Sequence, residues 1–311
     1  MSDNPPAPGP DLAAQGDPQV VHLPARTPFD FERSLAFLTS FPTMAGEHGV
    51  SGRTITRAVR EGGRLVGARL AAADPADGPG LRCELYADAP LDDAETAAVA
   101  DRLSFSLGLD DDLAAFYALA RGDEPFRPVL ERLHGYHQVK FPSPFEMLCW
   151  AVLAQRVPLP TARAMKQSLV QAVGNRVVLD GAEHWAFPEA DQLLPFTEQE
   201  LHALVGNQRK SGYLYALARH WQDIDESFLR AGPYEQVQER LLEIPGIGPW
   251  SSSFVLIRGL GRMEFLAGDK EMLRAAARVY GRAVGEDEFV ELAGRYGDLK
   301  GYWGHYLRVS G

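Results

Sequence analysis

A glycine-rich interruption between two apolar helical segments constrains this chain more than any other feature of its sequence. Residues 241–259 read LLEIPGIGPWSSSFVLIRG. An amphipathic helix is predicted over 233–243, and a second helix is predicted to start at Pro249. Gly246 and Gly248 allow a tight turn between them, and the first amides of a helix have no partner within that helix. The segment is therefore predicted to be a helical hairpin whose open amides suit an anion such as a phosphodiester; an ordinary connection between two helices is the alternative.

Length and composition are those of a soluble globular protein with two or three domains. The chain has 311 residues, 45% of them apolar and 23% charged, which is an ordinary globular balance. It has no run of about 18 apolar residues that would span a membrane, and its first residues lack the basic and apolar regions of a signal peptide. Cys83 and Cys149 have no Cys-x-x-Cys spacing, which excludes a cysteine-ligated zinc or four-cysteine iron–sulfur site. The net charge of −11 argues against a nonspecific coat on nucleic acid.

The hydrophobic pattern divides the chain into three parts. Residues 1–18 have the composition of a disordered tail. Residues 19–110 combine a helical segment with alternating strands around the pair Gly62-Gly63, which is typical of a small α+β domain. Residues 111–311 have helical periodicity, so the predicted fold class is α+β, with a small N-terminal antiparallel-sheet platform followed by an all-α part. Helices in that part are predicted over 111–120, 126–134, 143–155, 160–173, 198–205, 210–221, 233–243, 249–259, 269–280, 286–296 and 299–309.

The residues after the hairpin carry a family resemblance. The second helix is followed by GRMEFLAGD, which ends at Asp269, and then by a helix that reads KEMLRAAARVYG. The order L-x-x-I-PGIG-x-W, F-L-x-x-D and helix resembles the helix-hairpin-helix (HhH-GPD) DNA glycosylase superfamily, and is most similar to the bacterial 3-methyladenine DNA glycosylase II type. The resemblance implies that the helical part is a helix-hairpin-helix glycosylase domain of two helical subdomains with the cleft between them. It covers 20–309, and further similar segments lie at 22–38, 141–157, 204–218 and 295–307.

This resemblance implies a monofunctional glycosylase. Such an enzyme flips an alkylated purine (the 3-methyladenine and 7-methylguanine class) out of damaged double-stranded DNA and hydrolyses its N-glycosidic bond, leaving an abasic site in base excision repair. Asp269 would stabilise the cationic sugar and orient water, or it would serve only as a helix N-cap. Trp250 stands where bifunctional relatives carry a Schiff-base lysine, so no lyase activity is expected. Trp250 and Phe254 would line an aromatic pocket that attracts cationic rings, with core packing as their alternative role.

The resemblance also implies contacts with DNA. Gln155 and Arg156 would fill the gap left by the flipped nucleotide; a phosphate contact or a plain surface role is the alternative for Arg156. Carbonyls near Ile244 and Gly246 would hold a structural sodium or potassium ion, and neither another cofactor nor a catalytic metal is expected. We expect a cytoplasmic, nucleoid-associated monomer that binds damaged DNA and no membrane. The remaining candidate DNA contacts are Gly246, Ile247 and Gly248 in the hairpin and the basic residues Lys210, Arg258, Arg274 and Lys300.

Three departures from the family pattern leave other hypotheses open. Ala267-Gly268 replace residues that are usually proline and often acidic, so the Asp269 carboxylate would be less fixed. Pro249 removes one amide donor from the hairpin, and the negative net charge predicts weak, salt-sensitive DNA binding. The chain would then be a noncatalytic or weakly active DNA-binding relative, or a glycosylase for another damaged base. An oxidised purine is disfavoured because Trp250 occupies the lysine position.

Overall fold

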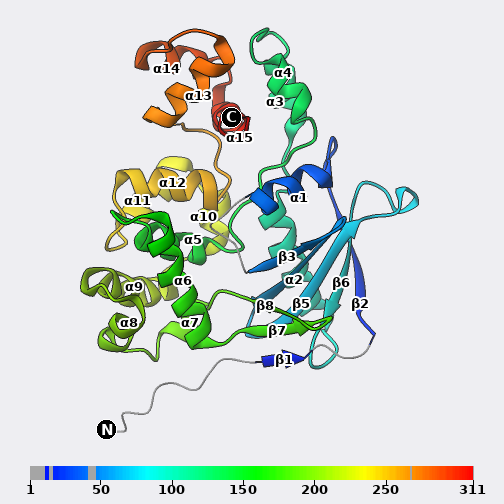
Figure 1. The fold of residues 1–311 in the computed structure, drawn as a ribbon, viewed down its shortest axis with the longest axis vertical. Helices are drawn as coiled ribbons and strands as arrows, with labels where there is room; N and C mark the ends of the chain where they lie inside the picture. The colour runs from blue at the N-terminus through cyan, green and yellow to red at the C-terminus, as the bar shows by residue number, and fades with distance from the viewer. Residues whose placement is uncertain (1–10, 14–16, 41–46, 267, 311) are drawn as a thin grey trace.

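The N-terminal part of the protein is built on a five-stranded antiparallel sheet, shown in Figure 1. The structure is a computed structural model, and the residues it describes are 11–13, 17–40, 47–266 and 268–310. Leu81, Cys83 and Leu85 alternate inward and are buried, as period-2 patterning requires. Gly62 and Gly63 join two strands with φ of +56° and +84°, which confirms the predicted turn. In sheet order the strands are β2 (Gln19–Pro24), β6 (Gly80–Tyr86), β5 (Arg64–Ala72), β4 (Thr54–Glu61) and β3 (His48–Ser51).

A second, three-stranded sheet corrects two sequence predictions. Strand β1 (Asp11–Ala13) lies inside the range 1–18 that was predicted to be a disordered tail, and it pairs in parallel with β7 (Arg176–Leu179). Strand β8 (Ala182–Trp185) pairs antiparallel with β7, so the part after residue 110 is not all-α. The β7–β8 turn is Asp180-Gly181, both with positive φ, and an Asp-Gly pair is a strong hairpin signal that the helical reading of this region overlooked.

The helices after residue 110 match the predicted positions closely, with α7 and α10 as additions. Ser143, Thr197 and Asn207 each cap a helix through a side-chain oxygen, which explains why these helices begin there. Among the described residues, no helix is both long and apolar enough to cross a membrane. The helices are α1 (Phe31–Ser40), α2 (Asp93–Leu107), α3 (Leu113–Ala120), α4 (Arg127–Arg132), α5 (Pro144–Leu153), α6 (Leu159–Val173), α7 (Ala190–Leu193), α8 (Glu198–Val205), α9 (Gln208–His220), α10 (Glu226–Ala231), α11 (Tyr234–Leu242), α12 (Pro249–Gly259), α13 (Lys270–Tyr280), α14 (Glu286–Gly294) and α15 (Lys300–Val309).

Two large hydrophobic cores organise these elements. One core joins the platform sheet and α1 to α3, α4 and the C-terminal helices α13–α15, with Phe116 and Trp303 among its fully buried rings. The other joins α5, α6, α8, α9, α11 and α12. Figure 1 shows α13–α15 beside α3 and α4 at the top of the view, apart from α5–α12. Helix α12 belongs to the second core and α13 to the first, so the segment between them passes from one helical group to the other.

Candidate active site

The hairpin between α11 and α12 has the predicted open amides. Gly246 has φ +90°, and a Cβ there would come within 2.5 Å of the Tyr213 ring, so both backbone conformation and packing require glycine. Gly248 is extended and faces open space. Among the described residues, no hydrogen-bond partner is found for the amides of Gly248, Trp250 and Ser251. Three donors at the N-terminus of α12 are therefore available to an anion.

Ile247 lines the groove beside the hairpin, but neither its side chain nor its amide is free, so its DNA contact stays a prediction that would depend on other backbone atoms. Its side chain is buried in the α5–α12 core, and its amide donates to the Ile244 carbonyl at 3.0 Å. The Gly246 carbonyl accepts from Gln155 Nε2 at 2.7 Å. Each of these two carbonyls keeps a second lone pair, so the predicted monovalent cation remains chemically compatible with them. Among the described residues, no cluster of three or more His, Cys, Asp or Glu side chains suits a metal.

A groove beside the hairpin brings the predicted wedge residues to the predicted phosphate site. We call it the hairpin groove; Gln155, Arg156 and Tyr213 line it together with the hairpin glycines. Arg156 is exposed and has φ +53°, a left-handed conformation that is uncommon for a residue with a Cβ and concentrates at functional sites. Residues 155–156 and residues 246–248 thus lie along the same groove. Their contacts with DNA stay predictions.

Lys210 is placed differently from its prediction as a phosphate contact. It is buried, and its ammonium donates to the carbonyls of Val152, Leu153 and Gln155, where it satisfies the C-terminal carbonyls of α5. Burial lowers the pKa of Lys210. The residue beside it, Arg209, is exposed, lines the hairpin groove and donates to the Tyr213 hydroxyl at 2.8 Å. The sequence Arg209-Lys210 predicts a positive charge at this position. The rotation of α9 determines that Arg209, and not Lys210, is exposed in the groove.

The other basic residues that were predicted to contact phosphates differ in their solvent exposure. Arg258 is buried and does not lie on an outer surface, so its prediction as a phosphate contact does not fit. Arg274 is exposed on α13, and Lys300 is half-buried at the start of α15. Neither lines the hairpin groove.

A second cavity, which Trp250 also lines, contains the predicted catalytic and base-binding residues together. We call it the Trp250 cavity; its volume is about 290 Å³, and Trp250, Phe254 and Asp269 line it. The two aromatic rings stack with centroids 5.3 Å apart and planes 19° apart. Trp250 is 64% exposed, so core packing is excluded as its role. A flat, accessible aromatic surface of this kind suits a stacked planar ligand.

Both predicted roles of Asp269 are compatible with its position. It is the N-cap of α13, and its Oδ1 accepts from the Met272 amide at 2.8 Å. Its Oδ2 accepts from Arg308 Nη2 at 3.1 Å, and 40% of the Asp269 side chain is exposed. The expected free oxygen is therefore paired, but with an exposed partner that the sequence did not reveal, because Arg308 lies far along the chain on α15.

The departure at Ala267-Gly268 is explained in part. Ala267 lies outside the described residues. A Cβ on Gly268 would come within 3.1 Å of the Phe289 ring, so glycine allows the segment to approach α14 closely. Gly268 therefore packs closely against Phe289, which restricts the backbone next to Asp269.

Two of the residues that line the Trp250 cavity, Arg258 and His305, belong to a polar chain that continues to Tyr136. Arg258 Nη1 lies 3.1 Å from His305 Nδ1, and His305 Nε2 lies 3.3 Å from the Tyr136 hydroxyl. Because a guanidinium only donates, Nδ1 is the acceptor and the His305 proton sits on Nε2. Burial and the nearby Arg258 charge hold the pKa of His305 well below its usual value, so the imidazole is neutral. Burial lowers the pKa of Arg258 to about 10, which leaves it charged at neutral pH.

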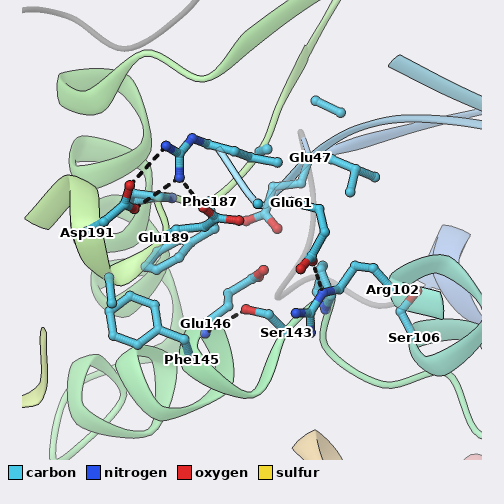
Figure 2. A pocket seen from close by; sticks show the side chains of 18 of the residues that line it. Glu47, Glu61, Arg102, Ser106, Ser143, Phe145, Glu146, Phe187, Glu189 and Asp191 are labelled. Carbon is cyan, nitrogen blue, oxygen red and sulfur yellow. Dashed lines mark hydrogen bonds and ion pairs between the residues drawn. The ribbon is translucent and has the colours of Figure 1, made fainter. Parts of the chain in front are cut away.

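A third cavity, of about 320 Å³, lies between the platform and the helical part, and Figure 2 shows its charged lining. We call it the junction cavity. Arg102 bonds Glu61 at 2.5 Å and Glu226 at 2.7 Å, which joins α2 to β4 and α10. Lys166 contacts both Glu146, at 2.6 Å, and Glu47. These groups satisfy one another, so the cavity has the character of a domain junction held by ion pairs.

Comparison with known proteins finds a family that matches the helical part of the chain. The sequence model of the HhH-GPD superfamily base excision DNA repair proteins matches residues 149–291, which include the hairpin and Asp269. This part of the chain is therefore similar to the HhH-GPD superfamily. The chain is also similar to the DNA-3-methyladenine glycosylase of Bacillus subtilis (strain 168), with 28% identity over 64% of this chain and 67% of the relative.

Other proteins are similar to this chain in sequence or in fold. The probable bifunctional transcriptional activator/DNA repair enzyme AlkA of Mycobacterium tuberculosis (strain ATCC 25618 / H37Rv) is 30% identical over 84% of this chain, and the chain spans about half (51%) of that relative. The 3-methyladenine DNA-glycosylase from Archaeoglobus fulgidus shares the fold with a TM-score of 0.75 and 23% identity, over 94% of this chain and 97% of that one. The apo 8-oxoguanine glycosylase/lyase of Clostridium acetobutylicum shares it with a TM-score of 0.64 and 14% identity, over 97% and 99%.

Proposed function

We propose that this protein is a DNA glycosylase of base excision repair that removes alkylated purines by hydrolysing the N-glycosidic bond. One observation carries the proposal: Asp269 and the Trp250–Phe254 stack line a single cavity next to a hairpin with open amides. Two curated relatives named DNA-3-methyladenine glycosylase, from Bacillus subtilis and Saccharomyces cerevisiae, support the choice of alkylated purines.

The hairpin and its groove would hold the DNA strand. A phosphate at the N-terminus of α12 would accept bonds from the amides of Gly248, Trp250 and Ser251 and be favoured by the helix dipole. Arg209 and Arg156 line the groove beside those amides and would contribute positive charge there. The negative net charge of the whole chain then makes this local cationic surface the main source of DNA affinity.

The cavity would hold the flipped base against the sugar-facing carboxylate. The purine would stack on Trp250, and Asp269 would face the sugar as positive charge develops on it. The Met272 amide fixes one carboxylate oxygen. Arg308 holds the other in the absence of DNA, and its exposed position lets that oxygen turn to the sugar and to the attacking water at small cost.

Hydrolysis without strand cleavage is the second part of the proposal. A lyase step needs an amine to form an imine with the sugar. Among the described residues, no lysine lines the Trp250 cavity, and Trp250 stands where bifunctional relatives carry that amine. The product would therefore be an intact strand with an abasic site.

The experiment is single-turnover base release from methylated duplex DNA at low salt, with wild type compared to Asp269→Asn. Asparagine keeps the N-cap acceptor and removes the charge, so we expect release to fall about 10²–10³-fold while DNA affinity and folding stay unchanged. Alkaline treatment of the product would reveal abasic sites, and without alkali the strand would stay intact.

Two results would redirect the proposal. DNA binding without release of methylated bases by wild type would identify a noncatalytic binding relative. Release of 8-oxoguanine, but not of methylated purines, would identify an oxidised-purine glycosylase.

A further inference from the structure

Gln138 brings an unpaired hydrogen-bond acceptor to the lining of the Trp250 cavity. It lies in the segment between α4 and α5 and is fully buried. Its Nε2 donates to the Ile257 carbonyl of α12 at 2.8 Å, and Ile257 lines the same cavity. Among the described residues, no hydrogen-bond partner is found for the buried Oε1.

The orientation of the Gln138 amide follows from its partner. A backbone carbonyl only accepts hydrogen bonds, so the atom that faces Ile257 is the amide nitrogen and not the oxygen. The backbone next to Gln138 is held as well, because the His137 ring contacts the carbonyls of Gly108 and Pro28 at 2.6 and 2.9 Å. A flipped amide would place two oxygens against each other, so Oε1 stays the unpaired atom.

An unpaired acceptor inside a protein is unfavourable. A buried oxygen without a donor has lost its bonds to water and gained nothing in exchange, and most buried polar atoms in native proteins have a partner. Trp250, Phe254 and Asp269 line the same cavity, which is where the proposed reaction needs the flipped purine. A donor on that purine would satisfy Gln138 Oε1.

We propose that Gln138 Oε1 accepts a hydrogen bond from the exocyclic amino group of the flipped purine. The inference rests on the proposed glycosylase function and names the feature of the substrate that the cavity recognises. Adenine carries this group at C6 and guanine carries it at C2. It is the only N–H donor of 3-methyladenine, and 7-methylguanine has it too, so one acceptor serves both substrates.

Methylation of the ring strengthens this hydrogen bond. A purine that is methylated at N3 or N7 while attached to its sugar carries a positive charge, which its amino hydrogens share. Hydrogen bonds from a charged donor are about twice as strong as those between neutral groups. Gln138 therefore favours a purine with an amino group over an analogue without one, and a methylated purine over an unmodified one.

Pairs of duplexes that differ by one amino group test the contact. 7-Methylguanine is compared with 7-methylhypoxanthine, which lacks the amino group at C2, and 7-methyladenine with 7-methylpurine, which lacks it at C6. The measurement is the single-turnover rate of release of each base by each variant, divided by the wild-type rate for the same base. This division cancels the different intrinsic stabilities of the glycosidic bonds.

Gln138→Met has a side chain of similar length without the amide oxygen. It is expected to lower release of the amino base relative to its partner about tenfold in at least one pair. A loss of fold changes all rates together and leaves these ratios unchanged. Gln167→Met is the matched control, because Gln167 is exposed on α6 and does not line the cavity, and it is expected to keep the wild-type ratios.

A second measurement uses wild type alone and covers the case in which Gln138→Met fails to fold. Free bases compete with the flipped base for the cavity, so their inhibition of base release reports binding without bond cleavage. 3-Methyladenine is compared with 3-methylpurine, and 7-methylguanine with 7-methylhypoxanthine. The amino base is expected to inhibit about tenfold more tightly than its partner, in the first pair for a contact at C6 and in the second for a contact at C2.

Unchanged release ratios in folded Gln138→Met, with methylated purines released by wild type, would overturn the role of Gln138 and leave the glycosylase function intact. If that variant does not fold, equal inhibition within both pairs of free bases would overturn amino-group recognition. Release of no methylated purine by wild type would overturn the proposed function and this inference with it.

Discussion

Lys166 forms ion pairs with Glu47 and Glu146, which line the junction cavity, and its side chain is 2% exposed. In the Trp250 cavity, by contrast, Asp269 and Arg308 pair with 40% and 43% of their side chains exposed. Removing one member of the buried set would leave uncompensated charge inside the protein. The exposed pair is worth at most about 1 kcal/mol and exchanges its partner easily. The comparison indicates that the exposed Asp269 carboxylate can exchange Arg308 for a substrate. The buried ion pairs of Lys166, by contrast, contribute to the stability of the fold.

The largest expected effect tests the structural side of this contrast. Lys166→Met leaves Glu47 and Glu146 buried without their ammonium, and we expect the free energy of unfolding to fall by about 3–5 kcal/mol. Urea denaturation measures it. Arg308→Met is the control from the Trp250 cavity, with an expected loss of at most about 1 kcal/mol. Equal losses in the two variants would erase the distinction between the cavities.

On the functional side, Trp250→Ala removes the exposed stacking surface. Base stacking on an aromatic ring contributes about 1–3 kcal/mol, so the single-turnover rate of base release should fall about tenfold to a hundredfold. Because Trp250 is 64% exposed, the midpoint of urea unfolding should hardly move. A large loss of stability with normal base release would show that the ring serves the fold instead.

The hairpin offers a matched pair of glycines. Gly246→Ala forces a Cβ into a left-handed residue and against Tyr213, and is expected to cost about 1–2 kcal/mol of unfolding free energy and to weaken DNA binding. Gly248→Ala meets open space and should leave stability nearly unchanged. Thermal unfolding and fluorescence anisotropy with a labelled duplex measure the two effects. If both variants behaved alike, the turn would not be fixed by residue 246.

The most gradual effect concerns pH, because it amounts to only about 1 kcal/mol at each unit of pH. Burial is the main cause that raises the pKa of Glu47 to about 7 from its usual 4.5. The native state therefore holds a proton that the unfolded state releases, and this stabilisation is complete below about pH 4.5 and is lost as the pH rises through 7. Wild type should lose stability relative to Glu47→Gln across that interval, by on the order of 1 kcal/mol per pH unit.

The same interval contains an opposing group. Burial also lowers the pKa of His48 to about 4, and this contributes stability that is lost as the pH falls. The difference between the two proteins at each pH, measured by urea denaturation, isolates the Glu47 contribution. A difference that does not change between pH 5 and 8 would contradict the raised pKa.

Features encoded by neighbouring residues could be predicted from the sequence. The hairpin turn, the N-cap role of Asp269 and the aromatic pair one turn apart on α12 all depend on spacings of a few residues. That Asp269 and the aromatic pair line one cavity followed from the family resemblance. The β7–β8 hairpin had an equally local signal in Asp180-Gly181 and was missed because the surrounding segments are helical.

Features that depend on tertiary contacts could not be predicted. Arg308 contacts Asp269 from a helix near the C-terminus, and no sequence spacing predicts that ion pair. Lys210 and Arg209 are adjacent, and the rotation of α9 against α5 decides that one is buried and the other exposed. Arg258 follows the helical spacing of a core residue, yet it places a charge at the wall of the cavity.

The most direct test of the account compares one carboxylate from each cavity in the same base-release assay. Asp269→Asn and Glu146→Gln both exchange a carboxylate for its amide. The account predicts that Asp269→Asn loses release of methylated purines at unchanged stability, while folded Glu146→Gln releases them at the wild-type rate and unfolds at lower urea. Normal release by Asp269→Asn would contradict the account, as would a loss of release in folded Glu146→Gln as large as that expected for Asp269→Asn.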